Sequence, residues 1–173
     1  MTGGKYARLS EAAARQYVLH QRMLPLPASL APDLKRQQAC YITVYEDPGQ
    51  RFRSIYGTPL PTSSCLAQEI INNTTQALAR ESHRVVRQAD LNDLHFEVAI
   101  LGPLERIGGP EHLDIRRYGV YVRSDRGKSS VVLPHRVGVE TAEEQFATVL
   151  RESGINPRHE AHTFYRFTVA YHT

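Results

Sequence analysis

The chain has 173 residues, of which 41% are hydrophobic, and this suits one domain, or one domain with a small second lobe, around a hydrophobic core. The net charge is only +3 and charges of both signs are interspersed, which argues against extended disorder and against a dedicated nucleic-acid-binding surface. No apolar run approaches the roughly 20 residues that cross a bilayer, and the N-terminal residues lack a secretory segment, so we expect a cytoplasmic protein without a membrane anchor.

The first predicted element is a helix over residues 9–23, with Ser10 as its N-cap. Apolar residues recur at helical spacing on one side of this segment. His20 lies on the same stripe, so we expect it to be packed in the core rather than to bind a ligand. Three prolines in residues 24–33 then predict a stiff connector that is not helical.

A β-hairpin is predicted next. Residues 39–46 are rich in β-branched and aromatic side chains, which indicates a strand. Asp47, Pro48 and Gly49 form a turn signal, after which residues 51–56 can return antiparallel.

The rest of the chain alternates further predicted helices with predicted strands. The predicted helices cover 64–81 and 141–153, and the predicted strands cover 94–101, 118–123, 130–134 and 163–171. The third helix carries a capping box from Thr141 to Glu144 and ends at Gly154. Hairpins with helices between them favour the α+β class, with a mainly antiparallel sheet and flanking helices.

Few residues stand in a pattern that predicts chemistry. Cys40 and Cys65 form no C-x-x-C pair, so we expect two free thiols in a reducing compartment. We expect burial to raise the pKa of Cys40, and we expect Cys65, near a helix N-terminus, to be the more reactive thiol. The eight histidines lack metal-site spacing, and no hydrolase or metalloprotease motif is present, so no metal, cofactor or catalytic residue is assigned.

Six blocks of sequence, in order, resemble the AMMECR domain family: "ACYITVYE", "FRSIYG", "LAQEIINNT", "LHFEVAILGPLERI", "GVYVRSDRGKSSVVLP" and "FYRFTV". The resemblance covers nearly the whole chain and implies a single domain over 1–173, with a larger and a smaller lobe. Family members are often encoded beside, or fused with, a Memo-type protein and a radical S-adenosylmethionine protein. The resemblance implies no established reaction.

This chain departs from the family at the signature hexapeptide L-R-G-C-I-G, which aligns with residues 52–57. Arg53 and Gly57 match the family, whereas Ser54 replaces a glycine and Ile55 replaces the signature cysteine. In a regular strand the side chains at positions 53 and 55 share a face, so the family's arginine could lower the pKa of its cysteine. Ile55 removes that chemistry.

We therefore expect an inherited cleft that has lost its nucleophile, with these lining residues: Arg53, Ser54, Ile55, Tyr56, Gly57 and His135. Arg53 needs an anionic partner, either a small bound anion or a nearby carboxylate.

Two function classes stay open. The first is a non-catalytic binding or accessory protein that acts with a Memo-type or radical-SAM partner. The second is an enzyme with a rebuilt site that uses His135 as acid or base, or Cys65 as a relocated thiol. The missing cysteine favours the first.

Overall fold

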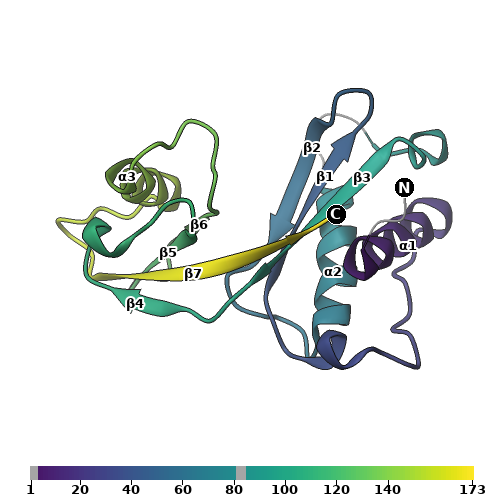
Figure 1. Cartoon of the computed structure of the whole chain (residues 1–173), viewed down its shortest axis with the longest axis horizontal. Helices are drawn as coiled ribbons and strands as arrows, with labels where there is room; N and C mark the ends of the chain where they lie inside the picture. Colours follow the sequence, from purple (N-terminus) through teal and green to yellow (C-terminus); the bar gives the residue numbers. More distant parts are fainter. Residues whose placement is uncertain (1–3, 81–84) are drawn as a thin grey trace. The chain divides into compact units, whose positions relative to one another are not determined.

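A computed structural model of the chain describes residues 4–80 and 85–173. The fold is α+β, and every described strand pair is antiparallel, as the sequence predicted (Figure 1). The chain forms two compact units. The first unit holds the residues up to Leu101 together with Ala170–Thr173, and the second unit holds Gly102–Val169. No helix in the described ranges has both the length and the apolar character needed to cross a membrane.

The first unit contains three complete strands and two α-helices. Its elements are α1 (Lys5–His20), η1 (Pro32–Lys35), β1 (Cys40–Glu46), β2 (Arg51–Gly57), α2 (Leu66–Ala79), η2 (Gln88–Asp90) and β3 (Leu94–Leu101). The strand order is β2-β1-β3. The predicted turn at 47–50 joins β1 to β2, where Gly49 and Gln50 both have positive φ.

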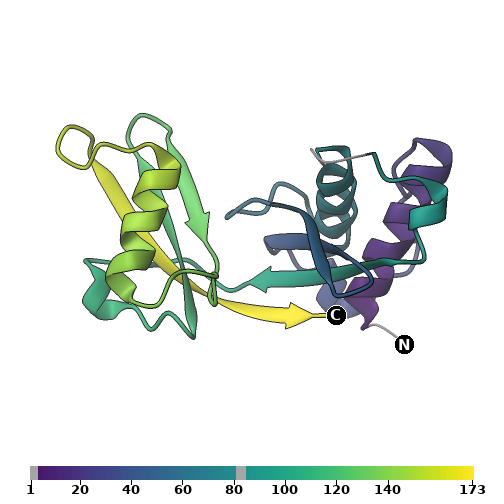
Figure 2. The same ribbon diagram turned by 90° about the horizontal axis from the view of Figure 1, so that it is seen from above.

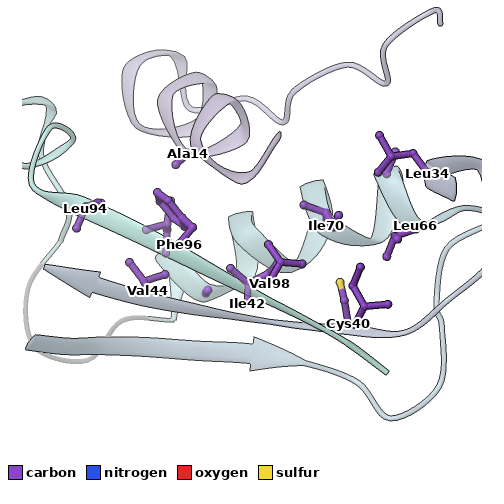
Figure 3. Packing of buried hydrophobic residues seen from close by; sticks show 14 of the residues in the cluster. Ala14, Leu34, Cys40, Ile42, Val44, Leu66, Ile70, Leu94, Phe96 and Val98 are labelled. Atoms are coloured by element: carbon purple, nitrogen blue, oxygen red, sulfur yellow. The ribbon is translucent and has the colours of Figure 1, made fainter. Parts of the chain in front are cut away.

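The core of the first unit lies between the helices and one face of this sheet (Figure 3). Even-numbered residues of β1 and β3, such as Ile42 and Val98, are fully buried against Ala14 of α1 and Ile70 of α2. Side chains alternate along a strand, so the odd-numbered residues of β1 and β3 point to the opposite face. We call that opposite face the outer face.

The second unit has a four-stranded antiparallel arrangement and one α-helix (Figure 2). Its elements are β4 (Glu105–Ile107), η3 (Pro110–His112), β5 (Tyr118–Ser124), β6 (Ser129–Val132), α3 (Ala142–Ser153) and most of β7 (His162–His172). The strand order is β4-β7-β5-β6. Phe146 and Val149 of α3 pack in a core cluster with Val120, Val122 and Val132.

The capping signals of α3 are confirmed. The Thr141 hydroxyl accepts a hydrogen bond from the backbone N–H of Glu144, and the Glu144 carboxylate accepts one in return from the N–H of Thr141. Gly154 ends the helix in the left-handed region, with φ 66°. The second helix was expected to end at residue 81, which lies outside the described residues.

Two predictions about the first helix are wrong. The helix begins at Lys5 with Gly4 as N-cap, and Ser10 is fully buried inside it. The reason is that α1 approaches its neighbours through small residues, including Ala7 and Ala13, so Ser10 serves as a small packing residue. His20 is exposed at the end of the helix and does not belong to the core. The short strand β4 was not predicted.

Candidate functional site

Ile55, which the sequence resemblance aligns with the signature cysteine, lies on the outer face of the first unit. It pairs with Thr43 of β1, and Thr43 pairs on its other side with Glu97 of β3. Directly paired residues of antiparallel strands share a face, so these three residues form one cross-strand row. Two strand spacings separate its ends by about 10 Å. Ile55 is 44% exposed, so the row ends at an accessible apolar side chain.

A β-bulge at Arg53 changes the expected geometry. Val44 pairs with Ser54 and Tyr45 pairs with Phe52, which leaves Arg53 as an extra residue between them. Arg53 is 5% exposed, in contrast to the accessible Ile55. The regular alternation assumed from the sequence therefore does not hold at this point, and Arg53 and Ile55 occupy different environments.

The carboxylate of Glu46 is the anionic partner that Arg53 requires. Nη1 of Arg53 lies 2.8 Å from Oε1 of Glu46, and both residues are buried. The more exposed Arg51 donates to the same carboxylate through its Nη2. Of the two partners predicted for Arg53, the structure thus provides the carboxylate.

Ser54 and Tyr56 lie on the helix-facing side of β2, opposite Val44 and Ile42. Tyr56 packs against the core cluster of the first unit. The Arg80 guanidinium lies 4.6 Å from the centre of the Tyr56 ring, within the range of a cation–π contact. These two candidates therefore belong to the packing under the sheet rather than to the outer face.

Gly57 is required by close packing against the neighbouring strand. It pairs with Tyr41, and a Cβ at position 57 would lie 2.5 Å from both the Cys40 carbonyl oxygen and Cγ of Tyr41. No side chain fits there.

His135 belongs to the second unit, in the turn after β6, where it is exposed and has φ 58°. The other five candidates are all on β2 of the first unit. The residues that accompany Ile55 on its own face, Thr43 and Glu97, were missed as site residues. The alternation in 94–101 is the signal that could have placed Glu97 on the face opposite the core, whereas its pairing with Thr43 required the structure.

Both thiols lie away from the outer face. Cys40 points into the core of the first unit, and burial raises its pKa to about 12, as predicted in direction. Hydrogen bonding from the Asn73 amide lowers this pKa in part. Cys65 is the N-cap residue of α2 and belongs to the same core cluster, with 8% of its surface exposed.

Two tyrosines, Tyr45 and Tyr171, lie near the Glu97 end of the row. Tyr45 meets Phe52 edge to face, with 6.4 Å between ring centres. Burial raises the pKa of Tyr45, and the charge of Glu97 raises it further. Burial, the charge of Glu97 and the neighbouring Tyr45 together raise the pKa of Tyr171 to about 12. Glu97, Tyr45 and Tyr171 therefore form one electrostatic group within the first unit. No three His, Cys, Asp or Glu side chains among residues 4–80 and 85–173 are grouped as a metal site requires.

Comparison with known proteins establishes the family. The AMMECR1 family model matches residues 7–172. The chain belongs to the AMMECR1 family. A Thermotoga maritima protein is 30% identical over 166 residues, which cover 95% of this chain and 94% of that protein. Protein CA_C1420 of Clostridium acetobutylicum is 34% identical over 141 residues, and the matched part spans 29% of that longer protein.

A solved structure agrees with the AMMECR1 fold. The crystal structure of the uncharacterised protein PH0010 from Pyrococcus horikoshii matches with a TM-score of 0.85 and 24% identity, covering 98% of this chain and 89% of that one. This similarity shows the fold alone. The family resemblance drawn from the sequence is confirmed.

Proposed function

We propose that this AMMECR1-family protein is a non-catalytic binding protein that works as an accessory subunit, and that its outer face is the binding surface. The observation that carries the proposal is Ile55. An apolar, accessible side chain stands where the family has its cysteine, in one row with Thr43 and Glu97.

Thiol chemistry at this face has no support in the geometry. Cys40 and Cys65 both belong to the core on the helix side of the sheet. The Thr43 hydroxyl belongs to a residue that is only 5% exposed. Of the two residues considered for a rebuilt enzyme site, His135 lies in an exposed turn and Cys65 is buried. No observation therefore favours the enzyme alternative.

The accessible apolar side chains of β2 suit the centre of a contact with another molecule. Phe52 is 53% exposed and Ile55 is 44% exposed. Exposed aromatic and aliphatic side chains of this kind form the cores of protein interfaces. The proposed partner is a Memo-type or radical-SAM protein, on the basis of the family resemblance, in a reducing cytoplasm. The proposal gives Arg53 a structural role through Glu46 rather than the role of binding a small anion.

Sedimentation velocity and calorimetry with the Memo-type and radical-SAM proteins of the same genome test this function. We expect the wild-type chain to bind one of them, and Phe52→Asp and Ile55→Asp to weaken that binding by roughly tenfold or more. The control is Val137→Asp, which changes a side chain that is 95% exposed in the second unit. Binding to neither protein, or equal binding by all variants, would overturn the proposal.

A further inference from the structure

Glu97 differs from the buried glutamates of this protein in its lack of a compensating group. Glu46, Glu69 and Glu160 accept hydrogen bonds from Arg51, backbone N–H groups and Lys128 respectively. Among the described residues, no hydrogen bond or ion pair includes the side chain of Glu97. His95 is two residues away on the same face, but its Nε2 lies 2.6 Å from Oδ2 of Asp47 and is already engaged.

Glu97 is only partly exposed, and burial raises its pKa. Tyr45 lies diagonally across from Glu97 on the same face, because Thr43 pairs with Glu97 and Tyr45 pairs with His95. Tyr171 lies on β7, the strand next to β3. The charge of Glu97 raises the pKa of both tyrosines, in agreement with this placement. A partly buried carboxylate attracts a cation more strongly than one in bulk water. The faces of tyrosine rings also attract cations, whereas they repel anions.

The rest of the row carries no charge. From Glu97 it continues across Thr43 to Ile55, about 10 Å away, with Phe52 exposed beside it. A charged head at Glu97 would therefore be followed by a surface that suits a short alkyl stem. An anion or a free inorganic cation would use only part of this surface.

We propose that the outer face binds a small organic cation, an alkylammonium or alkylguanidinium. Its charged head lies at Glu97 beside Tyr45 and Tyr171, and its apolar stem lies over Thr43 toward Ile55. This inference rests on the binding role proposed above, because it assigns a ligand class to the same face. It does not require a protein partner.

Calorimetry at low ionic strength and pH 7 with hexylammonium and hexylguanidinium tests the inference. We expect both cations to bind at least about tenfold more tightly than hexanol or hexanoate, which share the stem but lack the positive charge. Glu97→Gln should weaken cation binding by roughly tenfold. Glu105→Gln is the matched control, since it makes the same change on a strand of the second unit and should leave binding unchanged.

In NMR spectra, the backbone amide chemical shifts of Thr43, Tyr45 and Glu97 should change when the cation is added, and this would locate the bound cation. Equal binding of hexanol and hexylammonium, or full binding by Glu97→Gln, would overturn the inference. Nα-acetyl-lysine methylamide carries its ammonium group on a lysine side chain, as a partner protein would. It should bind more weakly than hexylammonium. Tighter binding of this peptide mimic would reassign the site to a partner's side chain.

The two proposals fail in distinguishable ways. If a Memo-type or radical-SAM protein binds but the alkyl cations do not, only the ligand assignment falls. If the cations bind at Glu97 and neither protein does, the accessory role falls and the ligand site remains.

Discussion

The guanidinium of Arg53 lies 2.8 Å from the carboxylate of Glu46, with both side chains nearly enclosed at the β-bulge of the first unit. The bulge turns Arg53 away from its expected place beside Ile55. A residue that the family motif suggests for chemistry thereby becomes part of the internal structure of the hairpin. Because an unpaired buried charge is costly, this pair constrains the hairpin geometry.

Two matched substitutions measure the buried pair. Arg53→Met should lower the free energy of unfolding by about 2 kcal/mol, because Glu46 loses a buried cation with which it forms an ion pair. Arg51→Met makes the same change at a 70% exposed side chain on the same carboxylate and should cost less than about 1 kcal/mol. Urea unfolding provides both values. Equal losses would mean that Arg53 is no more important to the fold than its exposed neighbour.

The second prediction concerns thiol reactivity. Cys40 should react very slowly with iodoacetamide at pH 8, because burial raises its pKa to about 12. Ile55→Cys should introduce an accessible thiol whose pKa is at or above the ordinary value of about 8.5. Arg53 is already paired with Glu46, and Glu97 in the same row is an acid, so neither side chain favours the thiolate. Alkylation rates against pH, with mass spectrometry to locate the label, check this. An Ile55→Cys thiol with a clearly lowered pKa would restore the sequence-based expectation.

The third prediction is a pH-dependent gain of stability in Glu97→Gln. Burial raises the pKa of Glu97 in the folded state, so the folded protein favours the protonated carboxyl. The stability that this group contributes is fully present below the unfolded-state pKa of about 4.3. It is lost as the pH rises through the folded-state pKa. Glu97→Gln removes the charge and should therefore raise the free energy of unfolding at pH 7. The gain should be less than about 0.5 kcal/mol, because the side chain is partly solvated, and there should be no gain at pH 4. Thermal unfolding at both pH values measures it, and lower stability at pH 7 would contradict the proposed environment of Glu97.

The fourth prediction tests the close strand contact at Gly57. Gly57→Ala should lower stability by about 2 kcal/mol, because its Cβ would overlap the Cys40 carbonyl and the Tyr41 side chain. Gly108→Ala is the control. Its Cβ would be 4.0 Å from the nearest atom, a Glu111 carboxylate oxygen, so the change should stay within about 0.5 kcal/mol. Chemical denaturation of the two variants decides whether the requirement for glycine is specific to position 57.

Elements with strong local signals could be predicted from the sequence. The strand at 94–101 was predicted with its observed bounds, since its alternation reflects one buried face. The capping box of α3 and its terminal Gly154 meet local requirements for hydrogen bonds and backbone angles. They can therefore be identified from the sequence without knowledge of tertiary contacts. The family, too, followed from six ordered blocks.

Only the tertiary structure decided which residues face one another. Serine is a common N-cap residue, but Ser10 lies within α1, where the packing of small residues buries it. The bulge that separates Arg53 from Ile55 depends on the pairing of two strands, and strand propensity carries no information about an extra residue in one of them. The row of Ile55, Thr43 and Glu97 joins residues up to 54 positions apart through sheet register, a property that exists only once the strands have paired.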